Sequence, residues 1–537
     1  MSAGRHRRNG AAAFALFVLL AVVHTWPLAA RPGTWSRVNT SDYLLNTWAI
    51  DWVARTLPRD PAHLFDANIF HPHRYTLAYS EPLILHGILA MPVLWLGGSP
   101  VLAHNLVLLA GFALTGWAFA WYVHRLTASW GAGLVAGSLV AFNAHQLVRL
   151  AHVQALHLEL LPLIFVAFDR LLAGGRLRDA AALGVAVAAQ ATISIYLLVF
   201  AAWALVTGAL ARVREWTGRS RWRLGVLLLL AAAISLLAAL PVLWPYVTLA
   251  RTQRLGRGAD DAVRWAASWS DYLFTGARVH FDLWSYRFRR SPSAIFPGIV
   301  ATLLVLVALG RAWRSQVHVR MWAAVVAGAV LLSIAPHLPG FEAVHGVLPP
   351  LRAIRAFSRA GQIVLVGIGV LAGFGAAWLL SRVPGSRRVW LAAGLLLLVN
   401  LEALRAPFRY VEFRGIPPIY DVLAAERDAV VLELPFFRRR QRYGNADYML
   451  YATRHRHPLV NGYSGFVPPD YDRIATEVRR LPAPEAVEFL RGLGVTHVVV
   501  HERGYGRHYL AAVQAAGVFD LVASLEGVSL FRLSGVP

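Results

Sequence analysis

The chain has 537 residues, of which 57% are hydrophobic and 15% are charged, and this composition excludes a soluble globular protein of that length. It contains no cysteine, which excludes disulfides, thiolate nucleophiles and cysteine-ligated metal centres. The formal charge of +23 comes entirely from Arg, an excess typical of a GC-rich bacterial genome, and the Arg residues lie in short segments between apolar runs. That distribution indicates membrane topology and argues against nucleic-acid binding.

The first segment has several Arg residues followed by the apolar stretch 11–23. Two interpretations fit this pattern: a retained transmembrane helix, which we favour, or a signal peptide with its cleavage site at residues 28–30. Both interpretations place the residues after Pro32 outside the cytoplasm.

The stretch 180–210 contains 31 uncharged residues, or about 46 Å of helix, which is long for one membrane crossing and short for two. Because Arg residues precede and follow it, the positive-inside rule puts both ends in the cytoplasm and predicts a hairpin. The total is then about eleven transmembrane helices with a cytoplasmic N-terminus. The other predicted spans are 101–123, 130–144, 155–172, 224–247, 296–312, 321–336, 360–381 and 389–405.

This threading predicts a polytopic membrane domain over residues 1–405 and a small extracytoplasmic α/β domain over residues 406–537. The membrane domain has two long external loops, 30–81 and 248–295, and a short apolar segment, 82–96, that we interpret as an interfacial or re-entrant helix. In the C-terminal domain the β-branched runs 429–434 and 495–500 predict strands, and 484–493 and 508–516 predict helices.

The first external loop carries an early carboxylate, Asp42, four residues before Asn46. If residues 43–53 are helical, these two side chains share a face, and Trp48 and Trp52 lie at the lipid headgroups. Asp42 can then accept a proton from a hydroxyl. The alternative is that Asp42 is only the N-cap of this helix, with Ser41 as a rival cap.

A second polar cluster in that loop consists of His71, His73 and Glu81. Two histidines at i and i+2 can bind a metal together with a carboxylate, but no third His follows, so solvated loop histidines are the simpler interpretation. We therefore assign no metal site and no cofactor, and a divalent metal is the alternative that no motif indicates. Glu81 precedes an apolar segment, where a carboxylate pairs with a substrate or an Arg, or stays solvated.

The connection after residue 144 is unusually polar and contains His145, Arg149, His152 and Gln154. On one helix, the first three would present three donors on the same face. The alternative is an interfacial helix with polar groups that reach to the membrane surface.

Three guanidinium groups precede the span 360–381, at Arg352, Arg355 and Arg359. Spacings of three and four residues predict one face of a helix, on the side of the membrane where few Arg are expected. Such a trio suits a phosphate or diphosphate, and the alternative is pairing with lipid headgroups or loop carboxylates. Loop 248–295 could close over a site, but its sequence singles out no residue.

Five motifs carry a resemblance to a known superfamily. They are Asp42-Tyr-Leu-Leu-Asn-Thr-Trp, Asn68-Ile-Phe-His-Pro-His, Tyr79-Ser-Glu-Pro, His152-Val-Gln and Asn461-Gly-Tyr-Ser-Gly-Phe. With some eleven crossings and an external C-terminal domain, the chain resembles the integral-membrane glycosyltransferases of the C superfold (GT-C), which include protein O-mannosyltransferases, aminoarabinose transferases and oligosaccharyltransferases, and looks like a bacterial branch of them.

The resemblance implies an enzyme of the bacterial inner membrane that moves a sugar from a polyprenyl-phosphate donor to an acceptor hydroxyl on the extracytoplasmic face. It implies that Asp42 is the general base and that the Arg trio holds the lipid phosphate, while Asn46, the two loop histidines, Glu81, His152 and Gln154 bind substrate. Only one acid stands at Asp42, unlike in the metal-dependent members. The alternative function is a lipid-linked glycan transporter or a non-catalytic assembly factor for envelope glycans, which predicts inverted repeats or a polar path that the sequence does not show.

Overall fold

The structure is a computed structural model that describes residues 2–37, 39–216, 221–253, 258–289, 293–352, 354–503 and 506–534. The chain divides into two compact units. Unit 1 comprises residues 1–31, 106–243 and 256–409, and unit 2 comprises residues 32–105, 244–255 and 410–537. Two long helices, α4 (Pro100–Thr127) and α11 (Arg221–Thr252), contribute residues to both units.

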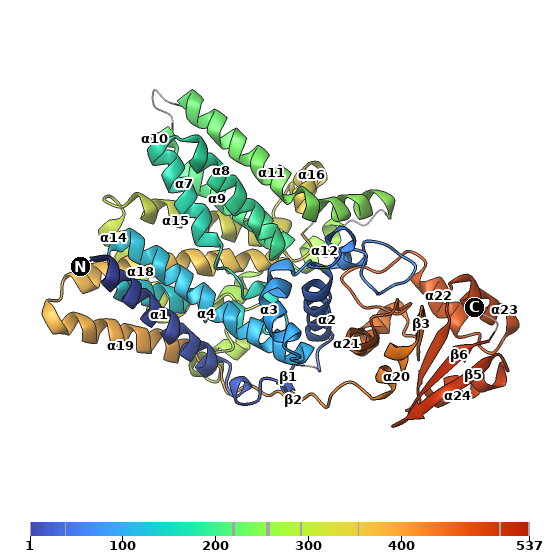
Figure 1. The fold of residues 1–537 in the computed structure, drawn as a ribbon. Helices are drawn as coiled ribbons and strands as arrows, with labels where there is room; N and C mark the ends of the chain where they lie inside the picture. The colour runs from blue at the N-terminus through green and yellow to red at the C-terminus, as the bar shows by residue number, and fades with distance from the viewer. Residues whose placement is uncertain are drawn as a thin grey trace. The chain divides into compact units, whose positions relative to one another are not determined.

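Unit 1 is built from helices (Figure 1). Besides its parts of α4 and α11 it contains α1 (Ser2–His24), α5 (Trp130–Ala141), α6 (Ala144–Val148), α7 (Leu161–Gly174), α8 (Leu177–Ala189), α9 (Ile195–Ala211), α10 (Val213–Trp216), α12 (Ala259–Arg264), α13 (Arg278–Phe281), α14 (Ile299–Ala312), α15 (Val317–Ile334), α16 (Phe341–Val347), α17 (Pro349–Arg352), α18 (Gly361–Ser381) and α19 (Gly385–Ala403).

The core of unit 1 is α18, which packs against α5, α14 and α15. Its glycines allow close approach: a side chain at Gly375 would collide with the backbone carbonyl of Leu304, and one at Gly369 would meet Val140. Small residues at helix contacts are how apolar helices pack closely inside a membrane. The buried face of α18 therefore follows from its glycine content.

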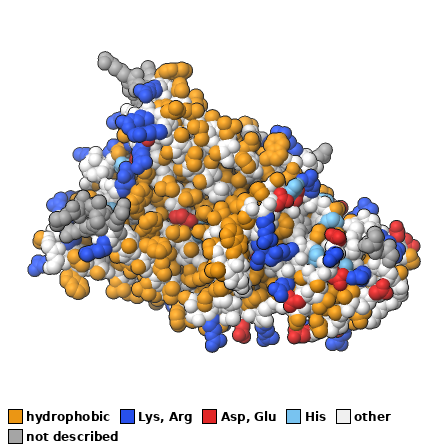
Figure 2. Space-filling model, viewed as in Figure 1, with side chains coloured by type: hydrophobic (Ala, Val, Ile, Leu, Met, Phe, Trp, Pro, Cys, Tyr) orange, Lys and Arg blue, Asp and Glu red, His pale blue; other side chains and the backbone are white. Residues whose placement is uncertain are grey.

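Five helical segments of the described chain are long and apolar enough to cross a membrane, namely Pro100–Thr127, Trp130–Val148, Trp222–Thr252, Val317–His337 and Phe357–Ser381. Four shorter apolar helices accompany them: Arg8–His24, Ile84–Trp95, Ile195–Ala211 and Ile299–Ala312. Hydrophobic side chains cover much of the surface over the helices of unit 1 (Figure 2). On α11, for example, Leu229, Leu236 and Leu237 are all more than half exposed, as expected of a lipid-facing helix.

The stretch 180–210 forms two helices, as the predicted hairpin requires. The first, α8, ends at Ala189, a 3-10 turn follows over Gln190–Thr192, and α9 begins at Ile195, where Ser194 caps it by accepting from the amide of Leu197. The total of about eleven crossings remains a prediction. The described part of loop 248–295 forms the end of α11, then α12, α13 and short 3-10 turns.

Unit 2 combines the first loop with the C-terminal segment. The loop contributes β1 (Trp35–Ser36), α2 (Ser41–Thr56) and α3 (Ile84–Trp95), the last over the segment predicted as an interfacial or re-entrant helix. The C-terminal segment contributes β2 (Val411–Glu412), α20 (Ile419–Ala425), β3 (Val431–Leu434), α21 (Ala446–His455), α22 (Tyr471–Val478), α23 (Pro484–Gly492), β4 (His497–His501), α24 (Gly506–Ala515), β5 (Phe519–Leu525) and β6 (Val528–Leu533).

The sheet of unit 2 has the strand order β3-β4-β6-β5, with β3 and β4 parallel and the other pairs antiparallel. Both runs predicted as strands are confirmed, as β3 and β4, and both predicted helices are confirmed, as α23 and α24. Every residue of β3 is buried, including Glu433, whose carboxylate accepts from the hydroxyl of Tyr420 at 2.9 Å and lies 2.8 Å from His501 Nε2. These partners compensate the burial of a charge in an apolar strand.

Candidate functional site

Asp42 lies in the first turn of α2 in unit 2. The N-cap of this helix is Thr40, and its hydroxyl donates to the carbonyl of Arg37 instead of capping the helix. The hypothesis that Asp42 or Ser41 is the N-cap is therefore wrong. The Asp42 carboxylate is instead half-buried, and its Oδ1 accepts a hydrogen bond from the hydroxyl of Tyr463 at 2.8 Å.

Residues 43–53 are helical, because α2 continues to Thr56. Asn46 therefore lies one turn along the same face from Asp42, and it is 3% exposed. The placement of Trp48 at the lipid headgroups was wrong. Trp48 is 2% exposed inside unit 2, and its buried indole N–H has a partner in Asn68 Oδ1. The indole N–H of Trp52 donates to the carbonyl of Leu64.

The segment that contains Tyr463 runs beside the first loop. The amide of Leu459 donates to the carbonyl of Asn68, and the amide of His71 donates back to the carbonyl of Leu459, both at 2.9 Å. Gly462 has no room for a side chain, because an added Cβ would lie 2.6 Å from the ring of Phe70. The two motifs that begin at residues 68 and 461 are thus packed together.

The motif Tyr79-Ser-Glu-Pro joins the same cluster, since the amide of Phe466 donates to the carbonyl of Tyr79. Burial raises the pKa of Tyr79 to about 12, and its hydroxyl donates to Gln253. Glu81 is 8% exposed, and its charge acts on the nearby Tyr246, so the interpretation of Glu81 as a solvated carboxylate is wrong. Four of the five motifs therefore meet in unit 2.

The two loop histidines have different surroundings. His73 Nε2 lies 2.8 Å from Asp470 Oδ1. His71 is half-buried, and burial is the main cause that lowers its pKa, against a hydrogen bond with the backbone of Leu493. Across the described ranges, no group of three or more His, Asp and Glu side chains is arranged to hold a metal ion.

In unit 1 the polar connection 145–157 is not one helix. It forms α6, which ends at Val148, and a 3-10 turn over Val153–Ala155, so the prediction of three donors on one helical face is wrong. Arg149 is the C-cap of α6, and His152 precedes the 3-10 turn. The two side chains therefore lie outside regular helix. Gln154 is buried in that turn.

The predicted helix for the Arg trio is also wrong. The chain leaves α17 at Arg352 and turns before a 3-10 turn over Phe357–Ala360. Arg352 donates to the backbone carbonyls of His345 and Gly346 at the end of α16, where a cation favours the helix terminus. The hydrogen bonds of Arg352 to these carbonyls give it a structural role at the end of α16.

The other two Arg residues are placed on aromatic rings. The guanidinium of Arg355 lies 5.6 Å from the ring centroid of Trp265, and that of Arg359 lies 4.7 Å from the ring centroid of Tyr196. Within the described chain, the Nε atoms of both are buried without a hydrogen-bond partner. A guanidinium stacked on a ring keeps its in-plane N–H donors for an oxyanion.

The two polar clusters of unit 1 meet at His145. The charges of Arg149, Arg359 and His152 all act on this side chain. The side-chain amide of Gln362, in the first turn of α18, donates to the side chain of Gln146 and to the carbonyl of Ala155. These bonds connect the start of α18 to the 145–157 segment. Unit 1 therefore presents a guanidinium-rich cluster that suits an anionic group.

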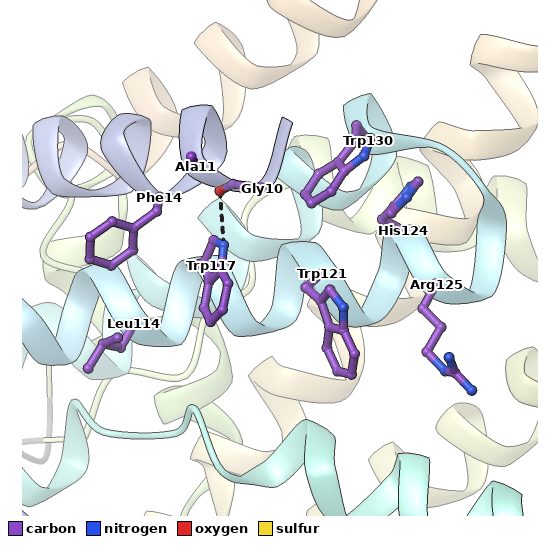
Figure 3. A pocket seen from close by; sticks show the side chains of 9 residues that line it. All are labelled: Gly10, Ala11, Phe14, Leu114, Trp117, Trp121, His124, Arg125 and Trp130. Atoms are coloured by element: carbon purple, nitrogen blue, oxygen red, sulfur yellow. Dashed lines mark hydrogen bonds between the residues drawn. The ribbon is translucent and has the colours of Figure 1, made fainter. Parts of the chain in front are cut away.

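An apolar groove of about 740 Å³ lies elsewhere in unit 1, between α1, α4 and the start of α5 (Figure 3). The indole N–H of Trp117 donates to the carbonyl of Gly10 across it, and His124 stacks on Trp130 at 4.3 Å. This aromatic lining suits a hydrocarbon chain. The sequence did not single it out, because its residues come from helices that have no motif in common.

No protein-family model and no curated protein matches the sequence. Solved structures do match: the arabinofuranosyltransferase AftD from Mycobacteria has a TM-score of 0.59 at 17% sequence identity, over 98% of this chain and 40% of AftD. The chain therefore shares a GT-C-like fold with this structure. It spans about 40% of the length of AftD.

Two other glycosyltransferase structures match with lower TM-scores. The oligosaccharyltransferase of Archaeoglobus fulgidus has a TM-score of 0.48 at 13% identity, over 98% of this chain and 74% of that protein. ArnT from Cupriavidus metallidurans, bound to undecaprenyl phosphate, has a TM-score of 0.46 at 13% identity, over 99% of this chain and 98% of ArnT.

Tyr463 is the residue of the candidate site that the sequence did not assign. It lies within a quoted motif, but nothing in the sequence links it to Asp42, from which it is separated by 421 positions. The local sequence shows only that Tyr463 lies between Gly462 and Ser464 in a predicted loop. The contact itself required the fold.

Proposed function

We propose that this protein is a membrane glycosyltransferase that moves a sugar from a polyprenyl-phosphate donor to an acceptor hydroxyl. The observation that carries the proposal is the half-buried carboxylate of Asp42, held by the Tyr463 hydroxyl where four motif segments meet. The GT-C-like fold supports it, because AftD, which shares that fold, is an arabinofuranosyltransferase. The sugar and the acceptor are not carried over from AftD.

The reaction is an inverting displacement at the anomeric carbon. The acceptor oxygen forms a bond to that carbon as the bond to the phosphate oxygen breaks, and the polyprenyl phosphate leaves with the electron pair. Asp42 takes the proton of the acceptor hydroxyl, because a positioned carboxylate can act as general base for an oxygen nucleophile. The Tyr463 hydroxyl donates to Oδ1 of Asp42 and so fixes the orientation of the carboxylate.

The guanidinium groups of Arg355 and Arg359 bind the phosphate and stabilise the charge that develops on it. Groups aimed at a leaving oxyanion are usually the largest single contribution to catalysis. Both groups have buried Nε donors without a partner among the described residues, and a phosphate oxygen would satisfy them. His152 and Gln154 lie near this cluster as candidate donor contacts, and Asn46, His71, His73 and Glu81 are candidate contacts in unit 2.

The proposal includes the membrane and the orientation. Arg is denser in the segments predicted to be cytoplasmic, which supports a cytoplasmic N-terminus and an extracytoplasmic C-terminal domain, residues 406–537, in the inner membrane of a bacterium. Lipid-linked sugars that have been moved across the membrane are the donors available on that face.

A panel of radiolabelled polyprenyl-phosphate sugars tests this function directly. Purified protein in lipid nanodiscs is expected to release polyprenyl phosphate from one donor and to move its label to water or to an added glycan acceptor. The measurement is separation of labelled lipid from labelled product. Binding of donors without turnover of any of them, together with movement of a lipid-linked sugar between the leaflets of sealed proteoliposomes, would instead identify a transporter.

Tyr463→Phe is expected to slow transfer by about ten-fold to 150-fold, because it removes a hydrogen bond to a charged group worth about 1.5–3 kcal/mol. The loss should appear in kcat and not in the KM for the donor, since Tyr463 positions the base. Steady-state kinetics with varied donor concentration measures both. Unchanged kcat would show that the hydroxyl does not position Asp42.

A further inference from the structure

A polar pocket of about 200 Å³ lies in unit 2, between the second half of α2 and the end of α21. It is separate from Asp42, which lies at the other end of α2. Arg side chains gather over the part of the surface where Figure 1 draws α2 and α21 (Figure 2). The lining residues used below are Trp48, Asp51, Trp52, Arg55, Arg59 and Arg456.

The charges of this pocket are unequally compensated. Arg55 donates to Asp51 at 2.8 Å, and Asp51 is 3% exposed. Within the described chain, the side chains of Arg59 and Arg456 make neither a hydrogen bond nor an ion pair, whereas Arg454 pairs with Asp421. The pocket lining also contains Asp60, whose carboxylate lies 2.9 Å from His63 Nδ1. Three guanidinium groups therefore line the pocket with two carboxylates, each of which already has another partner, which leaves an excess of positive charge.

The titration of the pocket residues agrees with an excess of positive charge. Partial burial and then the charge of Arg55 lower the pKa of Arg456, and Arg59 lowers it further. Asp51 opposes this, but burial raises the pKa of its own carboxyl. An added anion would relieve the repulsion among the three guanidinium groups.

The backbone at Arg456 gives an independent indication. This residue ends α21 with φ of +62°, in the left-handed region where glycine or asparagine is usual. An Arg at such a position is strained, and strained residues gather where a side chain serves binding or catalysis. A helix end alone would favour glycine or asparagine at position 456, so the presence of Arg there indicates a role for its guanidinium.

The two indoles of the pocket are fixed in place. The N–H of Trp48 donates to Asn68, and the N–H of Trp52 donates to Leu64. Both indoles line the pocket, and Trp48 is buried whereas Trp52 is partly exposed. A rigid aromatic ring beside cationic donors suits the apolar face of a sugar that carries a negative group.

We propose that this pocket binds the oxyanion of an acidic sugar, either a sugar phosphate or a uronate, with Arg59 and Arg456 as the anion donors and the Trp52 ring against the sugar. The shared chemistry is a sugar ring with a phosphate or carboxylate substituent. This binding does not depend on glycosyl transfer, so a failure here leaves the proposed function standing.

The test is a ligand-observed NMR titration of the full chain in nanodiscs of neutral lipid. The probes are glucose 6-phosphate, glucuronate, glucose and inorganic phosphate. At least one acidic sugar is expected to bind about ten-fold or more tightly than both glucose and inorganic phosphate, since charge-assisted bonds and ring contact act together. Equal binding of inorganic phosphate would overturn the sugar site, and equal binding of glucose would overturn the anion site.

Arg456→Gly separates binding from folding. Glycine accepts the left-handed backbone without strain, so the thermal midpoint should be unchanged or raised, while affinity for the acidic sugar falls about ten-fold or more. Arg59→Gln should lower affinity in the same way. Arg454→Gln is the matched control, because Arg454 lies two residues away and pairs with Asp421 outside the pocket. Affinity within about two-fold in both Arg456→Gly and Arg59→Gln would refute the proposal.

Discussion

Asp42→Asn is expected to lower glycosyl transfer by about 10²- to 10⁴-fold, the range that a positioned general base contributes. The amide cannot take the acceptor proton, but its oxygen can still accept the Tyr463 hydroxyl, so the contact seen in the structure is retained. Loss of the charge in the first turn of α2 costs only about 0.3–1 kcal/mol of stability. The measurements are initial transfer rate and thermal midpoint on the same preparation.

The chain offers a matched control for this substitution. Asp472 occupies the same position in the first turn of α22 that Asp42 occupies in α2, and its exposed carboxylate pairs with Arg439. Asp472→Asn therefore removes an equivalent helix charge without removing a base, and transfer should stay within about two-fold. Turnover in Asp42→Asn that matches turnover in Asp472→Asn would show that Asp42 is not the base.

The second large effect is expected at the guanidinium cluster of unit 1. Arg359→Ala should weaken donor binding or turnover by about ten-fold to 150-fold, the equivalent of one charge-assisted hydrogen bond. The donor affinity of Arg359→Lys should lie between those of the unchanged protein and Arg359→Ala. Lys keeps the charge but lacks the planar donors of the guanidinium above Tyr196. Arg355→Ala should behave like Arg359→Ala, since its environment on Trp265 is equivalent. Donor titration in neutral lipid measures these affinities.

Arg352 is the internal control for that series. Its guanidinium donates to backbone carbonyls at the end of α16, so Arg352→Ala should lower stability by about 0.5–1.5 kcal/mol and leave donor affinity within about three-fold. Equal, small effects of all three Arg substitutions that depend on anionic lipid content would indicate headgroup pairing. The donor phosphate would then have to be bound by other groups, with the 145–157 segment as the next candidate.

Local patterns were sufficient for much of the architecture. Hydropathy and Arg placement predicted the break between α8 and α9, because a long uncharged stretch with Arg at both ends has one topological solution. Short β-branched runs predicted β3 and β4, and helical periodicity predicted α23 and α24. These features depend on neighbours within a few residues, and such neighbours are visible in the sequence.

Predictions from helical spacing were wrong in the polar segments where the helix ends and the chain turns. The trio from Arg352 to Arg359 had helical spacing, yet the helix ends at Arg352 and the other two side chains stack on rings from distant segments. Trp48 was predicted at the membrane surface and is buried, because Asn68 provides a partner for its N–H. Each error came from a contact that spacing does not encode.

The composition and order of residues were enough to predict a polytopic membrane protein, because hydropathy and Arg placement are local properties. The motif at Asp42 is also visible in the sequence, but its assignment as a base came from the resemblance to GT-C enzymes. The tertiary structure alone brought Tyr463 to Asp42, packed Gly462 against Phe70, and put Arg59 and Arg456 around one pocket. The physical reason is that the free energy of such contacts comes from burial and hydrogen bonding between segments hundreds of residues apart. Those contacts exist only after the chain has folded.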